Sequence, residues 1–558
     1  MAKLSASSRM ASYLARLSPV PTFPEYTGPY RVGTMDVEVP ISEFKAPSAT
    51  PTGAQDIPTV QFRVFYPAVE DSNQKSIPWL PNPQRSHISA YTRFLGVHNT
   101  IAEFLSFLPR HLHYATIPVH KNADAKKADT PDGRWPTMVF SHGLGSNRNT
   151  YSYVAGSLAS HGVVVFCPEH RDGSAIATFI RAPDEKGGHK IMSVPYKRIS
   201  HDVTPEVYEQ REEQLRIRLW ELGLVHQAIL AIDRGTKFRN LNTTTPSLGQ
   251  FANSLMVHEP GQIIWAGHSF GATTMTQFLK STYYADDESL KAMKNPLFCP
   301  KEDSDIRKQI TERSITMLLD MWCMPLIGPN MEALFNLPYP VYADVPTAIG
   351  GAGLLAVESE TFYKWNEHLH VKARILSPDP KAKVVTPDVY ERPSGIKMTE
   401  AHFFYVINSV HLSQSDFGIL FPWATKKIFD SEQPERALRL NLRAQLQFMR
   451  NNGVPVAKTA AVDLIDGTSM DKIDAADSDS SDEEGLEDDK AIFDRDTPSV
   501  VDHWKWIDII GLGDAGEKEK GKSASRQVEE GEEKMKGELE PSEGATPPVV
   551  RTMSATAA

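Results

Sequence analysis

The stretch IIWAGHSFGATT, residues 263–274, decides the fold. Its apolar run leads into Gly-His-Ser-Phe-Gly and then into small residues that a helix accepts, so it predicts a strand, a sharp turn and a helix. A turn of this kind presents its central serine at the end of the strand, which makes Ser269 the candidate nucleophile. Gly267 and Gly271 are expected there because the sharp turn leaves no room for side chains. The alternative is an ordinary serine in a glycine-rich turn.

The surrounding chain predicts an α/β fold with a mostly parallel central sheet. Residues 24–453 alternate apolar runs with polar, helix-like stretches. The apolar runs are continuous, as expected for strands that helices cover on both faces. A helix is expected at 204–234, where apolar residues recur at three- and four-residue spacing. Strands are expected at 61–66, 137–140, 162–167, 262–266, 314–319 and 353–357.

Composition excludes several classes of protein. The chain has 558 residues, of which 41% are hydrophobic, so it can bury a large core. No apolar run reaches the length of about 18 residues that a transmembrane helix needs, and the first residues lack the apolar core of a secretory signal. The three cysteines are too few and too scattered for a disulfide framework or a zinc site. These features favour a cytoplasmic location.

The net charge of −11 is located almost wholly in the tail. Residues 466–497 hold 13 acidic and 3 basic residues, a net charge of −10, so the body is close to neutral. Nucleic-acid binding, which usually needs a basic face, is not expected.

Three segments follow from these patterns: a flexible N-terminus at 1–23, a catalytic domain at 24–453, and a largely disordered acidic tail at 454–558. An aromatic island at 502–513 interrupts the tail, and it either packs back on the body as a terminal helix or binds a partner. Ser478, Ser480 and Ser481 lie just ahead of carboxylates, the pattern that acidophilic kinases favour. A kinase is therefore one candidate partner, and a plain solvating tail is the alternative.

Ser269 would need a base to activate it and an acid to orient that base. In this fold the order along the chain is serine, acid, histidine, each at the end of a later strand. Asp320 ends the run SITMLLD, where a carboxylate is costly unless it has a hydrogen-bonding partner. His411 follows the apolar run in AHFFYVINSVH. The alternatives are that Asp320 caps a helix or pairs with a lysine, and that His402 is the histidine.

An oxyanion hole needs backbone N–H groups aimed where negative charge develops. One is expected from Phe270, the residue after the nucleophile. The other is expected from an early strand–loop junction, and TMVFSHGLGSNRNTYS provides one, with Leu144 N–H as the second donor.

Several blocks of the sequence resemble the platelet-activating factor acetylhydrolases of the plasma and intracellular type II group, within the α/β-hydrolase superfamily. The resemblance covers roughly residues 26–420, and EHRDGSA and LLDMW are its most specific parts. The blocks are TGPYRVGTMDV, FRVFYP, IPWLPN, VFSHGLGSNRNTYS, SLASHGVVVFCPEHRDGSA, REEQLRIR, GHSFGATT, LLDMWCMPL and NSVHLSQSDF.

The resemblance implies a calcium-independent serine esterase, with no metal and no cofactor, acting on phospholipids. It would remove the sn-2 acetyl group, or another short or oxidised acyl group, from platelet-activating factor-like lipids and release a lysophospholipid. It assigns the nucleophile to Ser269, the acid to Asp320 and the base to His411, with Leu144 and Phe270 as oxyanion donors.

The chain departs from the family pattern at three places. Ala272 stands where a second glycine usually follows the elbow, residues 371–400 look like an insertion, and the acidic tail has no expected counterpart. The rival functions are a general short-chain carboxylesterase or lipase on the same residues, and a non-catalytic scaffold that acts through the tail.

A lipid substrate raises the question of membrane contact. Residues 93–114, RFLGVHNTIAEFLSFLPRHLHY, combine an apolar stripe with basic and histidine residues at the end. They either lie on a bilayer surface as a peripheral contact or pack on the sheet as a core helix.

Overall fold

The computed structural model describes residues 20–94, 110–183, 188–421, 434–464, 486–494 and 503–513. Each of the six expected strands is present, and each end lies within two residues of its expected position. The long expected helix is α6 (Pro205–Asp233), whose first turn is capped by the Thr204 hydroxyl accepting from the Val207 N–H.

One large sheet carries these strands in the order β1, β2, β7, β6, β11, β12, β13, β14. Strand β2 is antiparallel to both of its neighbours, and the strands from β7 to β14 run parallel to one another. With helices on both faces, this arrangement confirms the predicted α/β-hydrolase fold. The bounds are β1 (Arg31–Pro40), β2 (Thr59–Ala68), β6 (Trp135–Ser141), β7 (Val164–Pro168), β11 (Ile264–His268), β12 (Thr316–Leu319), β13 (Leu354–Ser359) and β14 (His402–Val406).

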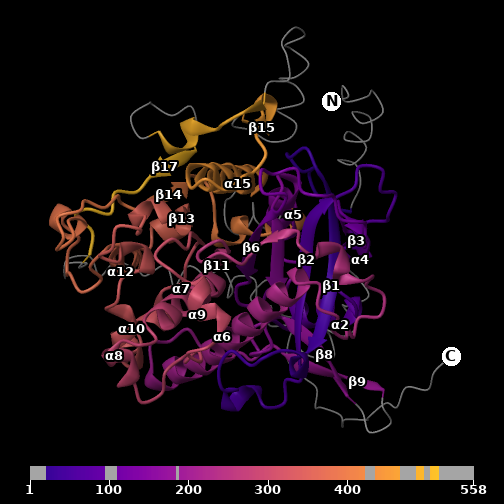
Figure 1. Cartoon of the computed structure of the whole chain (residues 1–558), viewed down its shortest axis with the longest axis horizontal. Coiled ribbons are helices and arrows are strands. Elements are labelled where there is room, and N and C mark those ends of the chain that lie inside the picture. The colour runs from indigo at the N-terminus through magenta and orange to yellow at the C-terminus, as the bar shows by residue number, and fades with distance from the viewer. Residues whose placement is uncertain are drawn as a thin grey trace, which may run out of the picture.

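Side chains alternate between two hydrophobic cores, one on each face of the sheet. In β13, Leu354 and Ala356 belong to the core that α6, α7 (Phe270–Tyr283) and α12 (Asn366–Leu376) cover. Leu355 and Val357 belong to the core under α5 (Ser152–Ser160) and α15 (Pro434–Asn451). Figure 1 shows α5 and α15 above the sheet and α6 and α7 below it. This double covering explains why the apolar runs are continuous.

Short elements connect the main ones. The helices are α2 (Gln84–Phe94), α4 (Arg110–Tyr114), α8 (Glu288–Lys291), α9 (Asp305–Gln309), α10 (Glu332–Phe335), α11 (Glu360–Tyr363) and α13 (Phe417–Leu420). The strands are β3 (Ile77–Pro78), β4 (Thr116–Ile117), β5 (His120–Lys121), β8 (Ala177–Pro183), β9 (His189–Pro195), β10 (Leu255–Met256), β15 (Thr459–Ala460), β16 (Leu486–Glu487) and β17 (Trp504–Trp506).

The segment considered for membrane contact lies mostly outside the described residues. Helix α2 ends at Phe94 and α4 begins at Arg110, so residues 95–109 between them are not described. Of the helices that the structure describes, none combines the length and the apolar character needed to cross a bilayer.

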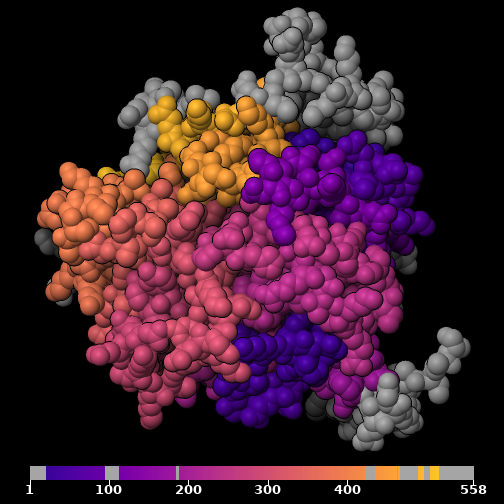
Figure 2. Space-filling view, in the orientation of Figure 1, coloured from indigo at the N-terminus to yellow at the C-terminus, as the bar shows by residue number. Residues whose placement is uncertain are grey.

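The aromatic island lies against the sheet as a strand, not as the terminal helix that one interpretation expected. Strand β17 pairs antiparallel with β14, and Trp504 stacks on Phe404 with ring centroids 4.8 Å apart. Beyond it, the Val385 N–H donates to the Leu512 carbonyl at 2.7 Å. The island therefore joins the sheet edge to residues 371–400, the segment expected to be an insertion, and Figure 2 shows this yellow segment on the surface beside the orange of α15.

A chain that ends at Leu464 should be less stable than the full-length chain, because it leaves β14 as an unpaired edge strand and uncovers Phe404. We expect a lower midpoint of thermal unfolding by calorimetry and more aggregation by light scattering. A chain that ends at Gly513 keeps the strand and serves as the matched control. Equal midpoints for all three chains would contradict the prediction.

Candidate active site

The expected nucleophile lies on a sharp turn between β11 and α7. Ser269 has φ 56° and ψ −121°, a backbone conformation that residues other than glycine rarely adopt. Its N–H donates to the Leu319 carbonyl of the neighbouring strand at 2.9 Å, and the residue is 7% exposed. The turn is therefore held by the next strand, with the serine at the carboxyl end of the sheet.

The two expected glycines lie where a side chain has no space. A Cβ on Gly271 would lie 2.0 Å from the carbonyl oxygen of Ser141, which ends β6. A Cβ on Gly267 would lie 2.5 Å from the backbone carbon of Gly271. Both distances are well inside van der Waals contact, so the turn and the start of α7 pack directly on the backbone of the sheet.

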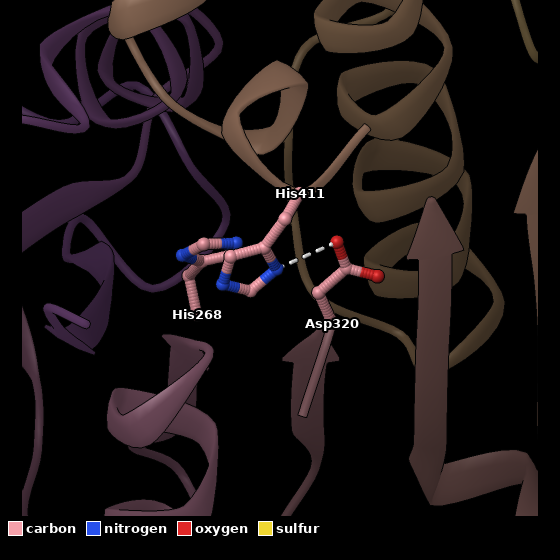
Figure 3. Close-up of side chains that lie close together, drawn as sticks. All are labelled: His268, Asp320 and His411. Atoms are coloured by element: carbon pink, nitrogen blue, oxygen red, sulfur yellow. Dashed lines mark hydrogen bonds and ion pairs between the residues drawn. The ribbon is translucent and has the colours of Figure 1, made fainter. Parts of the chain in front are cut away.

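Asp320 and His411 are brought together at the ends of β12 and β14 (Figure 3). The Asp320 carboxylate is fully buried, and its Oδ1 accepts from the Ser359 N–H at 2.6 Å. Its Oδ2 lies 3.0 Å from His411 Nδ1, and the His411 side chain is 24% exposed. A buried carboxylate bound to one ring nitrogen fixes the orientation of the imidazole and leaves the other nitrogen for chemistry.

Two rings hold the His411 imidazole between them. Phe362 stacks on it with centroids 4.3 Å apart and planes 5° apart. His268, the residue before the elbow serine, lies against it at 4.4 Å and 31° (Figure 3). Within the described part of the chain, no hydrogen bond joins the Ser269 hydroxyl to His411, and such bonds often form only when substrate is bound.

A buried hydrogen-bond chain supports His268. The Tyr151 hydroxyl accepts from the Gly143 N–H at 3.1 Å and lies 2.8 Å from His268 Nδ1. Burial, together with the nearby His411, holds the pKa of His268 well below its ordinary value, so its ring is neutral. Tyr151 thus connects the loop after β6 to the elbow.

The expected oxyanion loop lies on the elbow. A Cβ on Gly143 would lie 3.1 Å from the Ser269 Cβ, so the loop that contains Leu144 passes directly over the serine. Phe270 is the first residue of α7, where backbone N–H groups have no partner within the helix. The assignment of the Leu144 and Phe270 amides as oxyanion donors remains a prediction.

The family-specific motifs EHRDGSA and REEQLRIR meet beneath this loop. Arg218 of α6 is fully buried, and it donates to Asp172 Oδ2 at 3.0 Å and to the His142 carbonyl at 2.8 Å. Its guanidinium also lies 4.5 Å from the centre of the Phe270 ring. Arg218 therefore fixes the carbonyl two residues before Leu144 and contacts the ring of Phe270, the other expected donor.

Asp416 ties the histidine segment to the opposite side of the site. Its carboxylate accepts from the Trp79 indole N–H at 2.9 Å and from the N–H groups of Ser152 and Tyr153, at 2.9 and 3.0 Å, at the start of α5. Asp416 follows His411 by five residues, so these hydrogen bonds anchor the segment that carries His411. The competing His402 stacks on Phe493 at 4.6 Å, on the face of the sheet covered by α15.

These three residues also form a group of potential metal ligands. Side-chain atoms of His268, Asp320 and His411 lie within 4.8 Å of one another. Nδ1 of each histidine already takes part in a hydrogen bond, and the Asp320–His411 contact accounts for the cluster without a metal ion. Cys167, Cys299 and Cys323 are free thiols.

Sequence reasoning missed two groups that lie near Asp320 and His411. Phe362 and Glu358 lie in a segment, VESETF, whose only sequence signal was the apolar strand before it. Glu358, directly after the expected strand end at 357, was the available clue, because a buried carboxylate needs a partner.

Gly271→Ala should destroy the elbow, because the added methyl group would lie 2.0 Å from the Ser141 carbonyl oxygen. We expect loss of several kcal/mol of unfolding free energy or failure to fold, as overpacking and strain predict. The control is Gly395→Ala, at an exposed turn where no atom lies within 4 Å of the new Cβ, although φ there is positive, unlike that of Gly271. Similar unfolding curves for both variants, measured by circular dichroism, would contradict the steric argument.

The chain is similar to several known proteins. A solved ferulic acid esterase from Streptomyces cinnamoneus aligns with 77% of this chain and 92% of its own, at 14% identity and a TM-score of 0.40. A putative phospholipase A2 from Schizosaccharomyces pombe is 27% identical over 454 residues, 77% of this chain and 92% of the relative. A platelet-activating factor acetylhydrolase from Bos taurus is 30% identical over 327 residues, 58% of this chain and 60% of the relative. The family model described as platelet-activating factor acetylhydrolase, isoform II, matches residues 16–461, and the chain therefore belongs to that family.

Proposed function

We propose that this chain is a calcium-independent serine esterase that hydrolyses the sn-2 ester of platelet-activating factor-like phospholipids. The preferred sn-2 groups are acetyl and other short or oxidised acyl groups, and the product is a lysophospholipid. In chemical terms the chain is a 1-alkyl-2-acetylglycerophosphocholine esterase. The observation that carries the proposal is the buried Asp320–His411 contact of 3.0 Å next to a strained elbow serine, in a chain of this hydrolase family.

The mechanism proceeds through an acyl-enzyme. His411 accepts the Ser269 proton as the hydroxyl attacks the ester carbonyl, and Asp320 holds the imidazole and stabilises the imidazolium. The amides of Leu144 and Phe270 stabilise the negative charge on the carbonyl oxygen. His411 then returns the proton to the leaving lysophospholipid, and a water molecule activated by His411 hydrolyses the acyl-enzyme.

The electrostatics of the site support these roles. The buried Asp320 carboxylate accepts a backbone hydrogen bond on one oxygen and faces His411 with the other, so it can stabilise a cation on the ring. The Phe362 and His268 rings restrict the imidazole to that orientation. A preorganised base of this kind loses little freedom when it accepts the proton.

A phospholipase A2 that prefers longer acyl chains is the second candidate. The Schizosaccharomyces pombe relative named a putative phospholipase A2 aligns over 92% of its own length. Residues 371–400 look like an insertion relative to the family pattern, and this insertion is expected to alter acyl selectivity. Both candidates use the same proposed serine, acid and histidine, and they differ in the sn-2 group that is accepted.

Two proposed contacts concern residues outside the described ranges. Peripheral membrane contact through 93–114 rests on residues 95–109, and kinase action rests on Ser478, Ser480 and Ser481. Both remain predictions from the sequence.

The decisive measurement is the hydrolysis rate of phosphocholine lipids against sn-2 chain length, from acetyl to palmitoyl, with a chelator present. We expect kcat/KM to fall steeply as the chain lengthens and to be insensitive to the chelator. A flat or rising profile would replace the acetylhydrolase proposal by the phospholipase A2 candidate.

Ser269→Ala should lower this rate by several orders of magnitude, because the nucleophile is lost. The matched control is Ser281→Ala, a buried serine on the same helix, which should leave the rate within a few-fold of the unchanged protein. Full activity in Ser269→Ala would rule out the proposed mechanism.

A further inference from the structure

A buried ion pair lies directly behind the proposed acid. Glu358 is the penultimate residue of β13, and its Oε2 contacts the Lys372 ammonium of α12. Both side chains are 0% exposed. Taking two charges out of water is costly before their attraction offsets it, so such a pair needs an explanation.

Glu358 adjoins Asp320 through the backbone on both of its sides. The Asp320 N–H donates to the Val357 carbonyl at 2.8 Å, and the Asp320 Oδ1 accepts from the Ser359 N–H at 2.6 Å. The second oxygen of Glu358, Oε1, is buried and receives no hydrogen bond from the described residues. Two carboxyl groups therefore lie on neighbouring strands, and the Lys372 ammonium contacts one of them, Glu358.

The pair also lies close to His411, with the Phe362 ring between them. The Lys372 ammonium lies 5.2 Å from the centre of the Phe362 ring, and that ring stacks on His411. Burial and the nearby Asp320 carboxylate raise the pKa of Glu358, and Lys372 opposes this rise. Without the ammonium, Glu358 would place a second, uncompensated negative charge beside Asp320.

Three other titratable groups lie close to the pair. Burial raises the pKa of the Cys323 thiol to about 12 and holds the pKa of His368 on α12 well below its usual range, so both are neutral. Burial lowers the pKa of Lys280 on α7 to about 7. Lys280 is present in every variant below, so its titration is common to all of them.

We propose that Glu358 and Lys372 are positioning residues that act as one neutral unit to keep the Asp320 carboxylate available to His411. Glu358 compensates the positive charge of the ammonium, and Lys372 compensates the negative charge of Glu358. The net charge that His411 meets is then the single negative charge of Asp320, which matches the positive charge that forms on the imidazole. This inference rests on the proposed serine, acid and histidine.

The test is the rate at which a fluorophosphonate probe labels Ser269 between pH 5 and pH 9. Labelling needs the neutral imidazole but no particular lipid. Glu358→Gln leaves Lys372 unpaired, and the acidic midpoint of the profile should move down by about one pH unit, a tenfold change in proton affinity. Lys372→Met removes the ammonium and should move the midpoint up. The double variant should return to the midpoint of the unchanged protein.

The matched control is Asp489→Asn. It removes another buried carboxylate, paired with Arg443 on the opposite face of the sheet, and it should lower stability without moving the midpoint. Structural damage alone does not produce shifts of opposite sign that cancel in the double variant.

An unshifted midpoint in Glu358→Gln, or a double variant shifted as far as a single one, would overturn the inference. If Glu358→Gln does not fold, Lys372→Met carries the test, and a midpoint at or below that of the unchanged protein overturns it. Failure of the unchanged protein to react with the probe would instead contradict the proposed serine chemistry. The two failures are therefore distinguishable.

Discussion

The site depends on a close backbone contact between the elbow and its neighbouring strands. Gly271 packs so near Ser141 that a methyl group would overlap the carbonyl oxygen, and the Ser269 N–H is held by Leu319. This contact lets α7 begin directly against the sheet, which forces the serine into its positive φ. This backbone strain lies at Ser269, and the pairing of β6, β11 and β12 offsets its energetic cost.

Residues outside the elbow hold the loops around the site in place. Arg218 and Asp172 lie beneath the loop after β6, Asp416 binds the start of α5, and Phe362 packs on His411. None of these side chains is required to touch a substrate in the proposed mechanism. Their shared effect is that three loops from different strands lose their freedom before substrate binds, which lowers the entropic cost of catalysis.

The sequence predicted the parallel sheet and the order of serine, acid and histidine, because both follow from local signals. Buried strands give continuous apolar runs, and the elbow needs glycines at fixed spacing. The Glu358–Lys372 ion pair behind Asp320 was not predictable, since its two residues lie on different elements and meet only through packing. The fate of the aromatic island depended on pairing with β14, about 100 residues earlier. A strand of three residues, Trp504–Trp506, has no periodicity to detect.

Several buried ion pairs lie beside the proposed chemistry. Asp172 with Arg218, Glu221 with Arg171, and Glu358 with Lys372 are all nearly or fully buried, and each pair adjoins the loop after β6 or Asp320. Such pairs are weak evidence for stability, because well-packed apolar residues of equal volume are often as stable. Their cost is explained if they fix the direction of neighbouring groups, since an ion pair has preferred geometry and an apolar contact has little. On this argument the pairs are retained for the orientation of the loops at the site, at some expense to the stability of the fold.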